Sequence, residues 1–206
     1  MTAPTWATDG DLKPAPEPLL LVQAFVNTAD FDLGTDLLAD AATANRWLRD
    51  AGVQGTAVTA TTEELRLARE LREDIRALLL ANAGGPRPAA DSLHALQSVI
   101  NHARLTLALG PDGRLDLTAG QAPRLAAGLI MLLVIIRDAQ RDGTWARLKA
   151  CGNDDCRWVF YDRSHSRQGA WCDMATCGNM IKNRNLRARR GSQARATPLN
   201  AGQRQG

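Results

Sequence analysis

The spacing of apolar residues along the chain predicts a protein built mainly from α-helices. In the stretch LLLVQAFVNTAD, which begins at Leu19, residues Leu21, Phe25 and Val26 share one side of a helix. The following stretch DLLADAATANRWLRDAG predicts a second helix, and the glycine that comes after Arg49 can cap its end. Ordered structure is therefore expected to begin at Leu19 and to be helical.

The clearest helix signal begins at Thr61, where a Thr-x-x-Glu sequence has the form of a capping box. One side of this helix would be lined by Leu65, Leu71, Ile75, Leu78 and Leu79. A Gly-Gly-Pro sequence then stops it. Asp91 can cap a further helix through DSLHALQSVINHAR, and a long apolar helix is expected from about Ala122 to Asp142.

One β-hairpin is expected between the last two of these helices. The segment RLTLALGPDGRLDLT alternates apolar and polar residues on both sides of Gly-Pro-Asp-Gly, which is a turn sequence. The longest apolar run, GLIMLLVII from Gly128 to Ile136, is about half as long as a bilayer span requires. It predicts a buried core helix, and no membrane partner is expected.

Residues 1–18 are rich in Pro, Thr, Ala and Asp and show no periodicity, which predicts a disordered leader. They contain no basic segment followed by an apolar one, so no secretory signal is visible. We therefore expect a cytoplasmic protein whose cysteines are kept reduced. Arginine far outnumbers lysine and alanine is abundant, which is typical of a GC-rich bacterial genome.

Nothing in the helical body has the pattern of a catalytic constellation, so we expect the protein not to be an enzyme. His94 and His102 fall on one helix face and are interpreted as surface or capping residues. The acidic pairs that begin at Glu63 and Glu73 fit helix starts and solvated faces. The glycine-rich positions fit turns and helix ends rather than a phosphate-binding loop.

The net charge of +3 hides an uneven distribution of charge along the chain. Residues 1–146 contain 13 basic and 18 acidic residues, whereas residues 147–206 contain 12 basic and 4 acidic ones. A basic end on an acidic body is typical of a module that binds polyanions, although it can also serve solubility.

The four cysteines form two close pairs with the spacing C-x4-C-x15-C-x4-C: Cys151, Cys156, Cys172 and Cys177. Two such pairs on a chain that folds back on itself can supply the four ligands of one tetrahedral metal ion. Four thiolates favour a soft or borderline metal, and one structural Zn²⁺ is the expected ion. An iron–sulfur cluster and two disulfides are the alternatives, and His165 between the pairs could compete as a ligand.

The connector between the cysteine pairs predicts a short strand in the sequence RWVFYD. Alternation would place Trp158 and Phe160 on one face and Val159 and Tyr161 on the other. Together with Trp171, these aromatics are expected to form a small core over the metal. Stacking of nucleic-acid bases on them is the alternative role.

The segment from Cys151 to Arg190 resembles the CGNR zinc finger, through C-x4-C, RWVFYDRS, WCDMATCGN and an arginine-rich continuation. The stretches LLLVQAFVNTAD and DLLADAATANRWLRDAG resemble the helical ABATE domain that precedes this finger. Proteins of this architecture are regarded as stress-induced transcription regulators of bacteria. The resemblance implies that the four cysteines are zinc ligands, and Met180 stands where the family has arginine.

The predicted fold is mainly α, with a helical body, one β-hairpin and a small treble-clef-like finger made of a short hairpin and a helix. The expected divisions are a disordered leader (1–18), an ABATE-like domain (19–146), the finger with its basic helix (147–190) and a disordered tail (191–206).

A helical wheel places the basic and polar residues after the last cysteine on one arc of about 120°. Met180 lies inside this arc, while Ile181 and Ala188 would turn toward the finger. The residues expected to contact nucleic acid are Lys182, Asn183, Arg184, Arg187 and Arg190.

The sequence therefore predicts a DNA-binding regulator whose body forms a homodimer or senses an unknown small-molecule effector. A zinc-stabilised module for protein or RNA contacts is the first alternative. A redox switch, in which peroxide drives zinc release, is the second.

Overall fold

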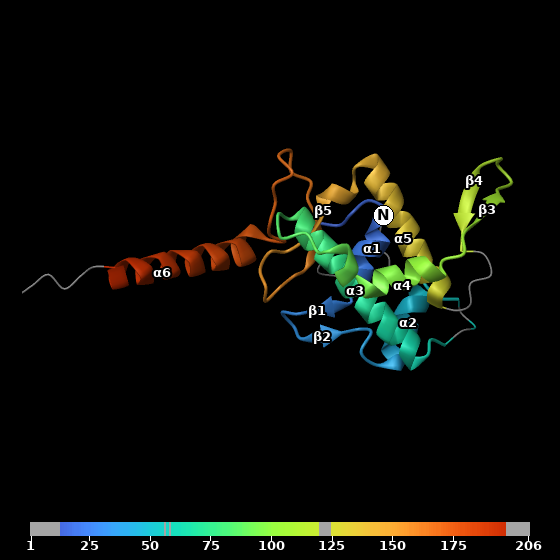
Figure 1. The fold of residues 1–206 in the computed structure, drawn as a ribbon, viewed down its shortest axis with the longest axis horizontal. Coiled ribbons are helices and arrows are strands. Elements are labelled where there is room, and N and C mark those ends of the chain that lie inside the picture. The colour runs from blue at the N-terminus through green and yellow to red at the C-terminus, as the bar shows by residue number, and fades with distance from the viewer. Residues whose placement is uncertain (1–12, 56, 58, 120–124, 197–206) are drawn as a thin grey trace, which may run out of the picture. The chain divides into compact units, whose positions relative to one another are not determined.

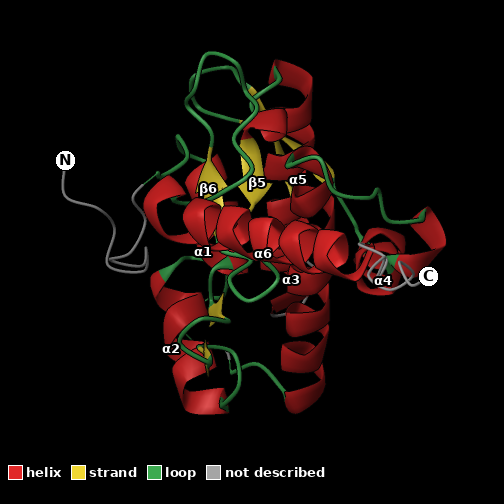
Figure 2. Ribbon diagram, turned by 90° about the vertical axis from the view of Figure 1, so that its left-hand side faces the viewer, coloured by secondary structure: helices red, strands yellow, loops and turns green. Residues whose placement is uncertain are grey.

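The computed structural model describes residues 13–55, 57, 59–119 and 125–196. They fall into two compact units, residues 1–172 and residues 173–206. Helices make up most of the structure and the strands form small antiparallel hairpins (Figures 1 and 2), which confirms the mainly α prediction. In the part of the chain that is described, no helix is both long and apolar enough to cross a membrane.

Helix α1 (Leu19–Val26) lies at the centre of the first unit and packs against α3 (Thr62–Asn82) and α5 (Leu125–Asp142) (Figure 1). All of its residues except Leu21 are buried. A helix that is apolar on nearly every side is expected in the interior rather than at the surface. Its one strongly polar residue, Gln23, is buried as well, and contacts the chain near the cysteines, as described below.

The starts of α2 (Ala41–Asp50) and α3 follow from local sequence. Asp40 caps α2, because its carboxylate accepts a hydrogen bond from the Thr43 amide at 2.9 Å. At the start of α3, Thr61 Oγ1 accepts from the Glu64 amide, and Glu64 Oε2 accepts from the Thr61 amide at 2.8 Å. The predicted capping box is therefore confirmed.

The start of α4 (His94–His102) differs from the prediction. Asp91 lies in a preceding 3₁₀ turn (Ala90–Ser92) and does not cap α4, whose N-cap residue is Leu93. Instead, Asp74 on α3 accepts a hydrogen bond from the Leu96 amide at 2.9 Å. The capping prediction was wrong because a carboxylate from a neighbouring helix satisfies the first turn of α4.

The predicted hairpin is confirmed as β3 (Thr106–Leu109) paired with β4 (Leu115–Thr118). Gly113, at φ +78°, ends the turn in a left-handed conformation that favours glycine. A smaller hairpin, β1 (Ala29–Asp30) with β2 (Thr35–Asp36), was not predicted. The start of the long helix expected near Ala122 lies outside the described residues, and α5 is described from Leu125.

Strands β5 (Leu148–Ala150) and β6 (Val159–Tyr161) pair antiparallel beside the first cysteine pair. A 3₁₀ turn (Trp145–Arg147) leads into β5. Every residue of both strands is buried, and the apolar core of the helical body includes Leu148, Ala150, Val159 and Tyr161. The core therefore continues across the boundary expected between residues 146 and 147, and the compact units divide after Cys172.

Part of the expected disordered leader is packed against β6. The Tyr161 amide donates to the Lys13 carbonyl at 2.9 Å, and the Arg163 guanidinium donates to the Pro14 carbonyl at 2.8 Å. The Ala15 amide donates to Gln23 Oε1. Residues 13–15 thus extend the edge of the β5–β6 hairpin, which the leader's composition did not indicate. The earlier leader residues lie outside the description.

The second unit begins with a π-helical turn (Met174–Gly178) that leads into α6 (Asn179–Ala196). Asp173 organises this start, because its carboxylate accepts from both the amide and the hydroxyl of Thr176 at 2.9 Å. Helix α6 continues beyond Arg190, where the finger was expected to end and the tail to begin.

Candidate metal centre and nucleic-acid interface

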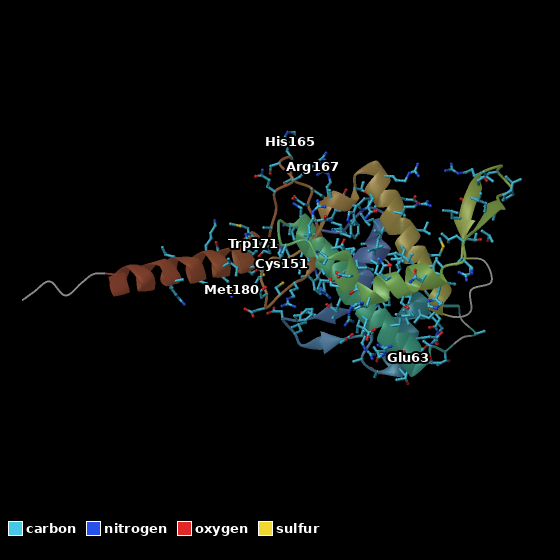
Figure 3. All side chains as sticks on the ribbon, viewed as in Figure 1. Glu63, Cys151, His165, Arg167, Trp171 and Met180 are labelled. Atoms are coloured by element: carbon cyan, nitrogen blue, oxygen red, sulfur yellow. The ribbon has the colours of Figure 1, made fainter. Side chains whose placement is uncertain are left out.

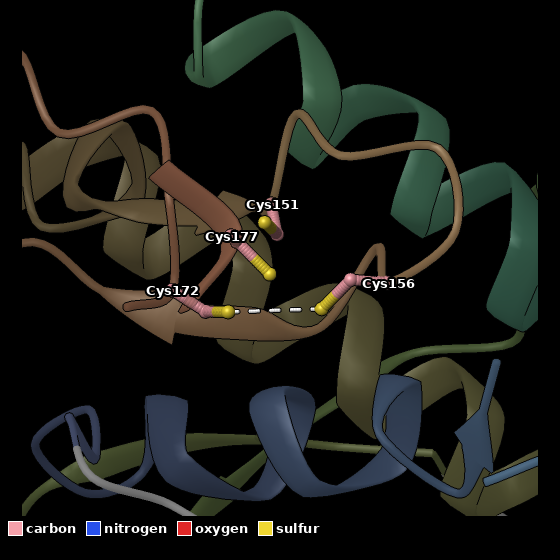
Figure 4. A group of neighbouring side chains, drawn as sticks. All are labelled: Cys151, Cys156, Cys172 and Cys177. Atoms are coloured by element: carbon pink, nitrogen blue, oxygen red, sulfur yellow. Dashed lines mark hydrogen bonds between the residues drawn. The ribbon is translucent and has the colours of Figure 1, made fainter. Parts of the chain in front are cut away.

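The four cysteines are gathered into one cluster, with all their Sγ atoms within 4.8 Å of one another (Figure 4). Cys156 Sγ and Cys172 Sγ are 3.6 Å apart. Thiolates bound tetrahedrally to one zinc ion at about 2.3 Å lie about 3.8 Å from each other. The cluster therefore fits one metal ion.

The geometry of the four cysteines also decides between a zinc ion, two disulfides, an iron–sulfur cluster and a site with His165 as a ligand. None of the four cysteines forms a disulfide in the described chain, and the 3.6 Å between the Cys156 and Cys172 sulfurs is far longer than an S–S bond of about 2.05 Å, so the two-disulfide alternative is wrong. An iron–sulfur cluster would place several iron and sulfide atoms between the thiolates and so spread them further apart. His165 is exposed (Figure 3) and does not belong to the metal-ligating group found among the described residues.

The first cysteine pair is presented by a tight turn after β5. The Cys151 amide donates to the Trp158 carbonyl at 2.9 Å, which continues the β5–β6 pairing to the cysteine. The amides of Cys156 and Arg157 both donate to the carbonyl of buried Asn153. Arg157 has φ +52°, a conformation uncommon for a side-chain-bearing residue, and it turns the chain back into β6. This turn brings both thiols to the same side.

Trp171 covers this turn just before the third cysteine. The Gly152 amide donates to the Ala170 carbonyl at 2.9 Å, which joins the two cysteine segments. A Cβ at position 152 would lie 3.1 Å from the Trp171 ring, a tight contact that a larger residue could accept only if the ring shifted by a few tenths of an ångström. Phe160 and Tyr161 are both buried, but Tyr161 belongs to the core of the helical body, so the small aromatic core expected over the metal stays a prediction.

The thiols of the cluster need a cation to ionise together. The pKa of Cys151 is lowered because Cys156 and Cys172 donate hydrogen bonds to its sulfur, and the backbone adds further donors. The same hydrogen bonds to Cys151 raise the pKa of Cys156 and of Cys172, because these two thiols must keep their protons to donate them. One thiolate is thus favoured and its neighbours stay protonated. A divalent ion supplies the charge that lets all of them ionise, with release of protons.

A buried ion pair anchors the long connector between the cysteine pairs. Lys149 on β5 donates to Asp162 Oδ2 at 2.9 Å, and their side chains are only 3% and 5% exposed. Lys149 also donates to the carbonyls of Arg167 and Gly169, and the Gly169 amide donates to Asp162. Burial alone would raise the pKa of Asp162, but hydrogen bonds from Ser164, Lys149 and Gly169 hold it well below its usual value. The two residues lie 13 positions apart and form no motif, so the sequence alone does not reveal this pair.

A second buried cation ties the first cysteine turn to the helical body. Arg76 on α3 donates to the Arg157 carbonyl at 2.8 Å and to the Val26 carbonyl at 2.7 Å. Glu73 accepts from its Nε at 3.0 Å, and the Phe31 ring centroid lies 4.9 Å from its guanidinium carbon. The acidic residue that we interpreted as part of a solvated face therefore supports the site. The sequence carries no local signal for this contact.

Helix α6 exposes the predicted nucleic-acid residues Lys182, Asn183, Arg184 and Arg187. Asn183, Arg184 and Arg187 line one shallow concavity together with Met180, whose side chain is 53% exposed. The side chain of Arg190 lies outside the described part of the chain. Ile181 is buried as expected, whereas Ala188 is exposed, so that expectation was wrong.

A helical body followed by a finger with four clustered cysteines defines a zinc-finger protein. Residues 20–141 match the model of the ABATE family, described as a "putative stress-induced transcription regulator", and residues 147–190 match the CGNR zinc finger. The first match covers more than half of the chain, so the chain belongs to the ABATE family. No curated protein matches it. The finger and its cysteines form a site for one structural zinc ion.

Proposed function

We propose that this protein is a transcription regulator that binds DNA through α6, which begins directly after the last cysteine. The observation that carries the proposal is the exposure of Lys182, Arg184 and Arg187 on a helix whose own sequence has no acidic residue. The whole segment 174–206 contains no Asp or Glu. Such a helix attracts phosphates without an opposing charge, and the affinity depends on salt because each contact releases a counterion.

The residues of the finger have separate roles in this proposal. The bound metal would link the turn 151–156 to the segment 172–177 and so fix the start of the basic helix. Asp173 organises the turn that follows Cys172 through its bonds to Thr176. The basic side chains of α6 would neutralise phosphates, whereas Asn183 can hydrogen-bond base edges.

Met180 gives this finger a different surface from that of its family. Its exposed side chain lies on the same concavity as Arg184 and Arg187. An arginine at this position would therefore add a phosphate contact to the same face. We propose that the chain has one phosphate contact fewer than the family pattern implies.

The helical body would sense a small-molecule effector or form a homodimer, and the protein would act in the cytoplasm without enzymatic activity. A closed shell of four thiolates has no open position for a substrate or water, which argues against zinc catalysis. RNA binding is a second candidate because Trp158 and Trp171 are only partly buried and could stack on bases.

The test is recovery of sheared genomic DNA by the zinc-loaded full chain, followed by sequencing of the bound fragments. Enrichment of a few loci, lost with a chelator and in the K182A/R184A/R187A variant with full zinc content, supports the proposal. The matched control R46A/R87A/R141A removes the same charge from exposed positions of the first unit and should bind as the unsubstituted chain does. Equal recovery by both triple variants would place the interface elsewhere.

A further inference from the structure

The β3–β4 hairpin has one face made only of leucine side chains. Its register pairs Leu107 with Leu117 and Leu109 with Leu115. Directly paired residues of an antiparallel hairpin point to the same side, as do residues two apart on one strand. These four leucines, which we call the leucine face, therefore lie together.

The opposite face of the hairpin is polar. Thr106 pairs with Thr118, and their hydroxyl groups are 2.9 Å apart, while Ala108 pairs with Asp116. The hairpin is thus amphipathic across its two faces, as a strand pair is when one face has an apolar partner.

In the described chain the leucine face is largely open to solvent. The exposed fractions are 68% for Leu107, 73% for Leu109 and 67% for Leu115, and Leu117 is partly buried. Figure 1 shows the hairpin extending away from α4 and α5 with no other labelled element beside it. A lone two-stranded hairpin is marginally stable in water, and clustered exposed apolar residues mark an interaction surface.

The charges around the hairpin suit a second copy of the same chain. Arg104, Asp112, Arg114 and Asp116 are all exposed and comprise two charges of each sign. In a two-fold dimer the same patch of both copies forms the interface. Because the four charges sum to zero, the two copies of this patch do not repel each other through a net charge. A nucleic acid would instead require an excess of basic residues here.

The size of the surface indicates how tight such an association can be. Leu105, which is 43% exposed, directly precedes β3 and adds to the apolar surface. Two copies of so small a patch fall in the range of reversible interfaces, below about 1,200 Å² of total buried area. We expect a dimer that forms at micromolar concentration and not an obligate one.

We propose that the leucine face is the surface through which two copies of this chain associate. This proposal assigns the homodimer suggested above for the body to a particular surface, and it rests on that part of the proposed function alone. It does not depend on DNA binding by α6, and its test contains no DNA.

The experiment is sedimentation of the zinc-loaded full chain from low to high micromolar concentration. In the L109T/L115T variant a threonine pair replaces the leucine pair, as at Thr106 and Thr118, so the strands keep residues with high β-propensity. The matched control T106S/T118S changes a directly paired residue pair on the polar face and leaves every charge in place. Circular dichroism of each variant checks that the helical body is folded.

The unsubstituted chain and T106S/T118S should shift from monomer to dimer over this range, while L109T/L115T stays monomeric with at least a tenfold weaker association. Hydrogen exchange of the amides in 106–118 should slow in the dimer, which reports the hairpin itself. An unsubstituted chain that stays monomeric at high concentration would overturn the proposal, as would an equally strong dimer of L109T/L115T. Loss of DNA binding alone would leave it standing.

Discussion

The side-chain amide of Asn27, the residue that follows the last turn of α1, forms two hydrogen bonds with the backbone of Val159 on β6. Asn27 Nδ2 donates to the Val159 carbonyl at 2.9 Å, and the Val159 amide donates to Asn27 Oδ1 at 2.8 Å. Both residues are buried. A side chain at the end of the central helix thus makes the backbone hydrogen bonds that a neighbouring strand would make with β6. The helical body and the first half of the finger are therefore parts of one core.

Replacing Asn27 with alanine should lower the free energy of unfolding by about 2 kcal/mol, because the buried Val159 amide loses its partner. Gln23, which also donates to the Val159 carbonyl, would satisfy only the acceptor. Urea denaturation measures the change. The control Gln97→Ala, on an exposed face of α4, should stay within about 0.5 kcal/mol. Equal stability of the two variants would show that this link contributes little.

Breaking the Lys149–Asp162 pair should destabilise the fold more. Lys149→Met leaves a buried carboxylate without its cation, which costs about 3–5 kcal/mol. The double variant K149M/D162N removes that charge and should recover part of the loss. A double variant that unfolds more easily than K149M, measured by the same denaturation, would contradict this account.

The stability that the Lys149–Asp162 pair contributes should fall as the pH is lowered. The pKa of Asp162 is lower in the folded chain, so its stabilising contribution is fully present above the unfolded value of about 4 and is lost as the pH falls through the folded-state pKa. Acidification should therefore destabilise the unsubstituted chain more than Asp162→Asn.

These contacts also mark what the sequence can and cannot predict. The Thr61 capping box and the cysteine spacing depend on residues close together in the chain, and both were predictable. Asp74 caps α4 from another helix, and Asn27 and Val159 lie far apart in sequence, so neither pair has a local pattern. Residues 13–15 pack beside β6 because of hydrogen bonds that their composition does not reveal.

Zinc removal should affect the two halves of the finger differently. Because β5 and β6 belong to the core of the first unit, their amides should stay protected from hydrogen exchange after chelation. The turn 152–158 and the segment 163–178 should lose protection, and most of the helical circular dichroism should remain. If Val159–Tyr161 lost as much protection as the turn 152–158, the metal and not the helical body would hold this hairpin in place.

Met180→Arg should strengthen DNA binding, because it adds a cation to the exposed face that contains Arg184 and Arg187. The slope of log affinity against log salt should steepen by about 0.9, the value for one more phosphate contact. Zinc affinity should not change. A variant with altered zinc affinity and unchanged DNA binding would assign this position to the metal centre.

The central claim is that the exposed cations of α6 contact DNA phosphates. It is tested most directly by measuring DNA affinity against salt for the zinc-loaded chain and for K182A/R184A/R187A. Loss of three phosphate contacts should make the slope shallower by about 2.7, while R46A/R87A/R141A keeps the slope of the unsubstituted chain. Identical slopes for all three proteins would contradict the claim, because α6 would then make no phosphate contact.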